Sequence, residues 1–68
     1  MALQKRSFSL AGHRTSVALE PEFWDALTSA AAARDELLSA LVARVDAERP
    51  PGQPLASALR IFALLFPR

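Results

Sequence analysis

The chain has 68 residues, so it holds at most one domain, and a domain this short needs help to stabilise its small core. It has no cysteine and one histidine, which excludes disulfides, thiolate metal sites and histidine-built metal sites. The net charge is +1, but residues 1–19 carry Lys5, Arg6 and Arg14 with no acid, while all seven acids lie within 20–48. The basic end is the candidate for an anionic partner, with a solvated basic tail as the alternative.

Neither a signal peptide nor a membrane span is predicted. No apolar run follows Lys5 and Arg6, and the longest apolar run, 61–66, is far shorter than the ~20 residues that cross a bilayer. We therefore expect a cytoplasmic protein without a membrane partner. The hydrophobic content of 51% is high for a small domain and indicates a surface that a partner chain covers.

Residues 1–12 are expected to form a flexible basic arm, because Ala11 and Gly12 interrupt the alternation that begins at Ser7. From His13 to Glu20, apolar and polar residues alternate, which predicts a β-strand. One face of this strand carries Thr15, Val17 and Leu19, and the other carries Arg14, Ser16 and Ala18.

A helix is predicted to begin at Glu20-Pro21-Glu22, since proline suits the first turn and acids complement the helix dipole. No proline or glycine lies within 22–48, so this stretch is compatible with one helix or two. We favour a break near Arg34–Leu37, with Asp35 as candidate N-cap, because a single long helix leaves its apolar stripe uncovered. The apolar faces carry Phe23, Leu27, Ala30 and Ala31 in the first helix and Leu38, Leu41, Val42 and Val45 in the second.

The domain organisation follows from a proline-rich linker over residues 50–54, which separates a core over 13–49 from a third helix over 55–66. Arg60 is the only charge in this third helix, so burial against a partner copy is favoured over binding to a membrane surface. One of its faces carries Leu55, Leu59, Phe62 and Phe66, and a second apolar strip carries Ile61 and Leu65.

A lone strand leaves its amides and carbonyls unpaired along both edges. We therefore predict an intertwined homodimer, in which residues 13–20 of two copies pair antiparallel about a two-fold axis. The outward face of that ribbon is short and polar, which suits the major groove of DNA. The predicted dimer core consists of Val17, Leu19, Phe23, Leu27, Leu41 and Val45.

Three stretches of sequence stand out in their order: KRS at 5–7 leading to HRTSVALEPEFW at 13–24, LSALV at 38–42, and LASALRIF at 55–62. With the order strand, helix, helix, they resemble the MetJ/Arc-like ribbon-helix-helix superfamily, and in particular a subgroup of short, uncharacterised bacterial proteins. The resemblance implies a mostly α-helical fold with one short β-strand, an intermolecular two-stranded ribbon and an extra C-terminal helix.

The resemblance also implies that the outward strand residues Arg14, Ser16 and Ala18 read base edges. Arginine can donate to guanine O6 and N7, serine can bond several bases, and alanine can contact a thymine methyl. In the alternative interpretation, Arg14 is a solvated charge at the strand edge, and Ser16 and Ala18 only fill the surface of the ribbon. The candidate phosphate contacts are Lys5, Arg6, His13 and Ser39.

The resemblance further implies that backbone amides at the start of the second helix hold a phosphate. There the sequence departs from the family pattern, because Asp35 replaces the usual turn glycine and Leu37 the polar cap. The carboxylates of Asp35 and Glu36 would repel a phosphate.

No catalytic motif accompanies the single histidine, so we expect neither enzymatic activity nor a cofactor. The first hypothesis is a homodimeric, DNA-binding transcriptional regulator. The second is the same dimer scaffold without DNA affinity, which holds an unidentified protein through the ribbon face or the third helix.

Overall fold

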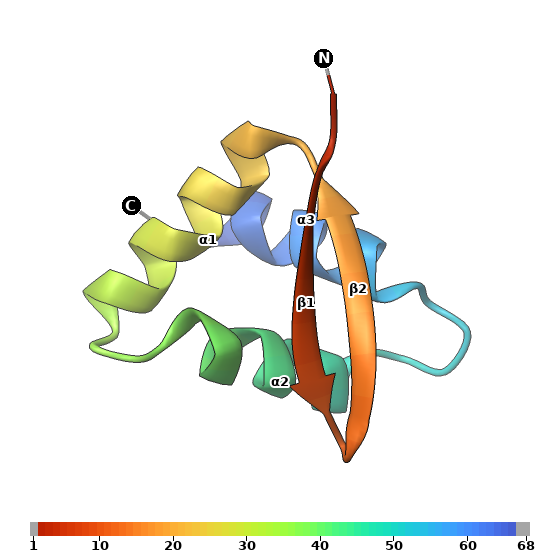
Figure 1. Cartoon of the computed structure of the whole chain (residues 1–68). Coiled ribbons are helices and arrows are strands. Elements are labelled where there is room, and N and C mark those ends of the chain that lie inside the picture. Colours follow the sequence, from red (N-terminus) through yellow and green to blue (C-terminus); the bar gives the residue numbers. More distant parts are fainter. Residues whose placement is uncertain (1, 67–68) are drawn as a thin grey trace.

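The computed structural model describes residues 2–66, which form two strands followed by three helices (Figure 1). One face of the strand pair packs against the helices, and the opposite face is open (Figure 1). The elements are β1 (Gln4–Leu10), β2 (His13–Leu19), α1 (Pro21–Ala33), α2 (Leu38–Glu48) and α3 (Leu55–Leu65).

Strand β1 corrects the expectation of a flexible arm. It pairs antiparallel with β2 in the same chain, from Gln4 opposite Leu19 to Leu10 opposite His13. Because β2 already has a partner, the lone-strand argument for a dimer is wrong, and the ribbon expected between two chains forms within one. The dimer itself therefore needs a different physical reason.

A two-residue turn closes the hairpin. Ala11 and Gly12 both have positive φ, 51° and 82°, as a type I′ hairpin turn requires. Alanine rarely adopts the left-handed conformation, which costs an L-residue roughly 1–2 kcal/mol. For this reason the dipeptide reads in the sequence as an interruption rather than as a turn.

The strand alternation predicted for β2 is confirmed. Val17 and Leu19 are buried, whereas Arg14 and Ser16 are exposed. The same alternation continues in β1, where Phe8 is buried on the same face of the hairpin. The hairpin therefore has an apolar inner face and a polar outer face.

Helix α1 begins where the sequence predicts, with Glu20 in an extended conformation as N-cap and Pro21 in the first turn. It ends in a Schellman motif: the Glu36 amide donates to the Ala31 carbonyl at 2.9 Å, and the Asp35 amide donates to the Ala32 carbonyl at 3.1 Å. Asp35, with φ of 54°, stands where such a motif usually has glycine.

The predicted break near 34–37 is confirmed, but the predicted cap is wrong. Asp35 closes α1, and Leu37, with φ of −69° and ψ of 146°, is the N-cap of α2. Helix α2 then buries Leu41, Val42 and Val45, as predicted from its apolar face.

Helix α3 follows the proline-rich loop and packs against α1, α2 and β2. It buries Leu55 and Leu59, but Ile61 and Leu65 remain 47% and 73% exposed, so the second apolar strip is not covered within one chain. Within residues 2–66, no helix is both long and apolar enough to cross a bilayer. The largest fully buried side chains are Trp24, Leu19, Leu27, Leu41, Leu59 and Val42.

The residues predicted to form a dimer core lie in the core of the single chain. Five of the six are buried there, namely Val17, Leu19, Leu27, Leu41 and Val45. The sixth, Phe23, is partly buried and packs against this core. Their role in a dimer interface stays a prediction, because one chain already accounts for their burial.

Candidate nucleic-acid interface

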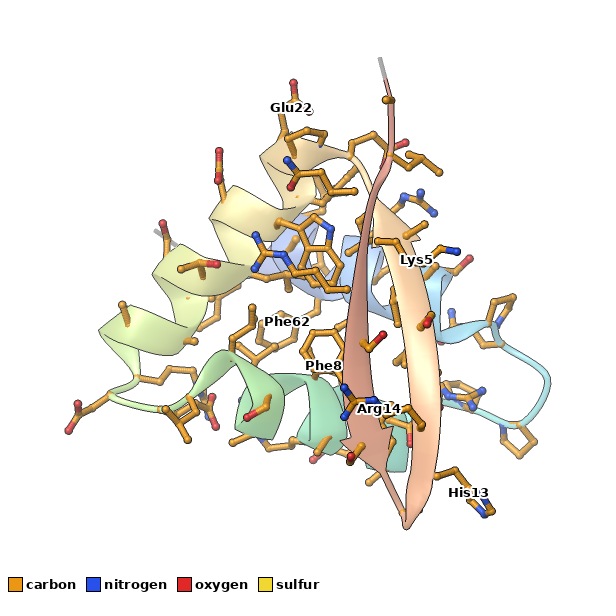
Figure 2. All side chains as sticks on the ribbon, in the orientation of Figure 1. Lys5, Phe8, His13, Arg14, Glu22 and Phe62 are labelled. Atoms are coloured by element: carbon orange, nitrogen blue, oxygen red, sulfur yellow. The ribbon has the colours of Figure 1, made fainter. Side chains whose placement is uncertain are left out.

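The outer face of the hairpin carries three cross-strand pairs, and we call it the reading face. Lys5 lies opposite Ala18 near the open end, and Arg14 lies opposite Ser9 near the turn (Figure 2). The middle pair is Ser7 and Ser16. Five of the six residues are exposed and Ala18 is half-buried. The predicted base-reading residues Arg14, Ser16 and Ala18 therefore share one open surface.

Side-chain hydrogen bonds connect the two strands across this reading face. The hydroxyls of Ser7 and Ser16 are 3.2 Å apart, and Arg14 Nη1 donates to Ser9 Oγ at 3.3 Å. A hydroxyl can both donate and accept, and a guanidinium has five N–H donors, so each group retains capacity for a ligand. The face can thus present donors at both ends and adaptable hydroxyls between them.

Arg6 lies on the other side of the hairpin. Its guanidinium stands over the Trp24 ring, 4.9 Å from the ring centroid, and Trp24 also packs against Phe8 with ring centroids 5.9 Å apart. The Trp24 indole Nε1 donates to the Gln4 carbonyl at 2.8 Å. These contacts attach β1 to α1. Lys5 and Arg6, both candidate phosphate contacts, thus lie on opposite sides of the hairpin. The contact of Arg6 with a phosphate stays a prediction.

His13, the first residue of β2, lies at the tip of the hairpin and projects away from the helices (Figure 2). It pairs with Leu10 and is exposed. Its pairing with the buried Leu10 places His13, like Arg6, on the side of the hairpin opposite the reading face, and its contact with a phosphate stays a prediction.

The start of α2 is not near the reading face. Helix α2 begins on the far side of the molecule from the hairpin (Figure 1), and this first turn carries Ser39, which is exposed. The Glu36 carboxylate there accepts hydrogen bonds from Arg34 Nε at 3.1 Å and Arg44 Nη2 at 2.7 Å. Two arginines thus offset the negative charge of Glu36, which was expected to repel a phosphate. A single chain nevertheless does not bring Ser39 and the hairpin together.

An ion pair fixes the corner between β2 and the helices. Arg60 of α3 donates from Nε and Nη2 to one carboxylate oxygen of Glu20, at 3.1 and 3.0 Å. A hydrogen bond with the Glu20 backbone, followed by the hydrogen bond from Arg60, lowers the pKa of this carboxyl below its ordinary value. The contact links residues forty positions apart and holds the open end of the hairpin on α3.

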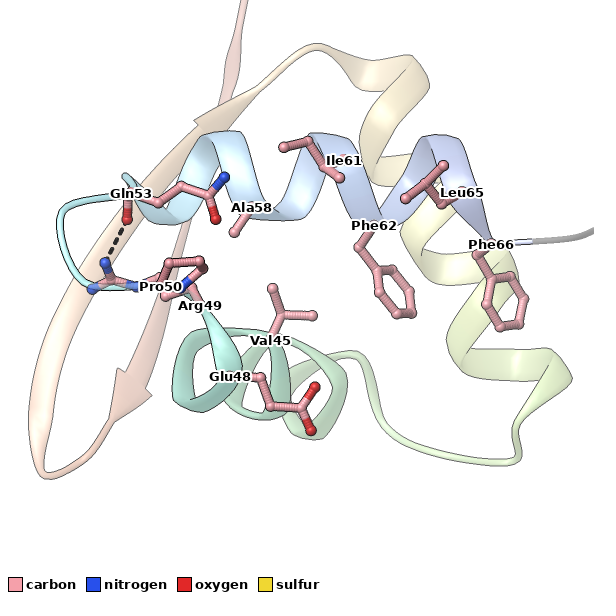
Figure 3. A pocket seen from close by; sticks show the side chains of 10 residues that line it. All are labelled: Val45, Glu48, Arg49, Pro50, Gln53, Ala58, Ile61, Phe62, Leu65 and Phe66. Carbon is pink, nitrogen blue, oxygen red and sulfur yellow. Dashed lines mark hydrogen bonds between the residues drawn. The ribbon is translucent and has the colours of Figure 1, made fainter.

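A groove lies on another part of the surface, between α3 and the end of α2. It has a volume of about 410 Å³, and Phe62 and Val45 face one another across it, with Ile61 and Leu65 along α3 (Figure 3). The groove is lined mainly by apolar side chains, so its chemistry suits an apolar partner rather than nucleic acid. In the part of the chain that the structure describes, no cluster of acidic, histidine or cysteine side chains is suited to a metal ion.

The sequence matches the family described as the ribbon-helix-helix domain over residues 3–66, nearly the whole chain. The chain belongs to the ribbon-helix-helix family. No curated protein and no solved structure matches it. Ribbon-helix-helix domains are typically DNA-binding regulators that usually act as dimers, and the fold is a non-enzymatic one. The predicted resemblance to the ribbon-helix-helix superfamily is thereby confirmed.

This ribbon-helix-helix chain has reading-face residues that sequence reasoning missed. Ser7 and Ser9 lie beside the predicted base-reading residues, and Lys5 belongs to the face itself rather than to a separate arm. The signal was present in Ser7-Phe8-Ser9-Leu10, whose alternation continues across the Ala-Gly turn in phase with β2. If residues 4–10 and 13–19 are taken as the two strands of one hairpin, then Lys5, Ser7 and Ser9 all fall on the reading face.

Proposed function

We propose that this ribbon-helix-helix protein is a homodimeric DNA-binding protein, and a transcriptional regulator, which inserts its hairpin into the major groove. The observation that carries the proposal is the reading face, an exposed, acid-free surface with Arg14 and Lys5 toward its two ends. Family membership supports the same function.

The dimensions of the hairpin support insertion. Paired strands lie about 4.7–4.9 Å apart, and the major groove, about 12 Å wide, admits a two-stranded ribbon. Arg14 can donate to guanine O6 and N7, Ser16 can bond several bases, and Ala18 can contact a thymine methyl. Lys5 at the margin of the reading face and His13 at the tip of the hairpin are suited to phosphates, which fix the register of the protein on the duplex.

The dimer is proposed on family grounds and on the uncovered apolar surface of α3. Leu64 and Leu65 are 80% and 73% exposed, an unusual exposure for large apolar side chains on so short a chain. A dimer with two-fold symmetry would present two hairpins to two half-sites. Sedimentation of the purified protein tests this, and a folded monomer at all concentrations would contradict it.

DNA binding is tested by titrating labelled random duplex DNA at low and moderate salt and following fluorescence anisotropy. We expect salt-dependent binding that Arg14→Ala weakens, and Lys5→Ala should reduce the slope of log K against log salt by about 0.9, the contribution of one neutralised phosphate. Arg34→Ala is the matched control, since it removes one positive charge at the turn between α1 and α2, away from the hairpin. Absence of binding at low salt would overturn the proposal.

The alternative function is protein binding on the same scaffold. The groove between α2 and α3, with the exposed Ile61 and Leu65 beside it, favours this alternative. The two functions separate in one comparison. Ile61→Ser, in the groove, should impair a protein-binding module and leave DNA affinity unchanged, while Arg14→Ala should do the opposite.

A further inference from the structure

The contacts that hold strand β1 reach across the hairpin turn. Trp24 of α1 donates a hydrogen bond to the Gln4 carbonyl, its ring packs against Phe8, and Arg6 stands over the same ring. The strand ladder joins β1 to β2, which also lies beyond the turn. Since none of these contacts needs β1 to belong to the same chain, the β1 of a second copy can make them equally well.

The turn that joins β1 to β2 is short and strained. It consists of Ala11 and Gly12, and Ala11 has a φ of 51°, in the left-handed region that an L-residue avoids. A short connection under strain favours exchange of the segment that it joins, because the strain is relieved when the connection extends.

Little apolar surface holds β1 in place. Only Phe8 and Leu10 of its seven residues are buried, and β2 is its single neighbour in the two-stranded sheet. Segments with few buried side chains open at a lower free energy than the rest of a fold. Strand β1 can therefore detach while the three helices stay packed.

We propose that two copies of this chain exchange β1, so that residues 4–10 of each copy pair with residues 13–19 of the other. Gln4 of one copy then lies opposite Leu19 of the other, as it does within one chain. The inference rests on the proposed homodimer and gives it an interface. This interface differs from the one expected from the sequence, in which residues 13–20 of both copies pair with each other, because β2 keeps β1 as its neighbour.

The closed monomer and the exchanged dimer contain the same contacts of β1, so the turn and the protein concentration decide between them. In the dimer, Ala11 and Gly12 extend instead of turning, which relieves the left-handed conformation of Ala11 once in each chain. Association costs translational and rotational freedom, which a higher protein concentration offsets. The two turn residues thus set the concentration at which copies pair.

Exchange preserves the reading face and divides it between two chains. Ser9 of one copy lies beside Arg14 of the other, and Ser7 beside Ser16, as they do within one chain. A dimer formed in this way keeps two such faces. The surface proposed for DNA therefore stays available in both forms.

The first test introduces cysteines into the middle pair of the ladder, in a chain that has none. The hydroxyls of Ser7 and Ser16 are 3.2 Å apart, so the double variant Ser7→Cys/Ser16→Cys brings two thiols within reach of a disulfide. The full chain is refolded at several concentrations, oxidised and run on a denaturing gel without reductant. The closed hairpin gives a cross-linked monomer, and exchange gives a covalent dimer whose share rises with concentration.

A matched control separates exchange from chance cross-linking. Ser29→Cys places one thiol on the exposed side of α1, and its dimer band measures random disulfides between copies. That band should stay faint under the same oxidation. Peptide mass mapping of the dimer from the double variant should find the bond between positions 7 and 16.

The second test changes the turn and keeps the serines. Asparagine accepts the left-handed conformation better than alanine, so Ala11→Asn should favour the closed monomer and raise the dimer Kd roughly 10-fold, because each dimer opens two turns. Gly12→Ala strains the turn further and should lower the Kd. Sedimentation measures the Kd, and circular dichroism checks that each variant is folded.

The outcomes distinguish the exchange from the function on which it rests. Only cross-linked monomer from the double cysteine variant, or a dimer Kd that ignores both turn variants, overturns the exchange and leaves the homodimer standing. A wild-type monomer at every concentration overturns both. Titration with duplex DNA decides DNA binding separately, since either form presents the reading face.

Discussion

The indole Nε1 of Trp24 donates a hydrogen bond of 2.8 Å to the backbone carbonyl of Gln4, and so joins the first turn of α1 to the first residue of β1. The Trp24 ring is completely buried, with Phe8 packed against it. One side chain on α1 thus holds the strand that supplies half of the reading face.

We predict that Trp24→Phe destabilises the protein by about 2–3 kcal/mol. The smaller ring leaves part of its buried volume empty, and the variant loses a hydrogen bond of about 1 kcal/mol to Gln4. Urea denaturation followed by circular dichroism measures the change. A loss below about 0.5 kcal/mol would show that β1 is held mainly by other contacts.

A substitution in the hairpin turn is predicted to stabilise the protein. Ala11 adopts φ of 51°, which asparagine tolerates better than alanine, so Ala11→Asn should raise the free energy of unfolding by about 0.5–1 kcal/mol. In a chain of this size, that is a rise of roughly 2–8 °C in Tm. Gly12→Ala is the opposing control: φ of 82° suits glycine alone, and this variant should melt at a lower temperature.

The end of α1 offers a second stabilising change. Asp35 has φ of 54° in a Schellman motif that ordinarily carries glycine, so Asp35→Gly should stabilise the fold by about 0.5–1 kcal/mol. Asp25→Gly, in the interior of the same helix, should instead destabilise it by about 1 kcal/mol. Equal effects of the two substitutions in thermal denaturation would refute the assigned motif.

Acid should weaken the corner between Glu20 and Arg60. The folded-state pKa of Glu20 is lowered by hydrogen bonds with its own backbone and with Arg60, so its contribution to stability is present above the unfolded-state pKa and is lost as pH falls through the folded-state pKa. Wild type should therefore exceed Glu20→Gln in Tm near neutral pH, and the two should converge in acid. Arg60→Gln should reproduce the loss, and the double variant should add little to either, since both groups make one interaction. Additive losses would contradict the pairing.

Sequence reasoning predicts most helical features of this fold because their signals are local. The Glu20-Pro21-Glu22 start and the apolar face ending at Val45 depend on residues within one or two turns of each other. The break near 34–37 is predicted from the need to cover an apolar stripe, which is a tertiary argument. The cap was misassigned because an acid in the left-handed conformation ends α1 there, a rarer role for aspartate than capping the next helix.

The strands show where local reasoning stops. The Ser7-to-Leu10 alternation is visible, but its pairing depends on Ala11 accepting a backbone conformation that alanine avoids. Tertiary contacts at Trp24 offset that cost, and no local pattern reports them. The sequence therefore predicts only the part of the reading face that β2 supplies, because the part from β1 depends on the pairing of the two strands.

Because the ribbon is made by neighbouring segments of one chain, it can form as soon as that chain folds, before any encounter between copies. Hairpins close on the microsecond scale, and their formation is a unimolecular event. The capacity to engage one half-site then does not depend on protein concentration. Assembly of two copies would instead set how strongly both half-sites are held together, through the effective concentration of the second hairpin.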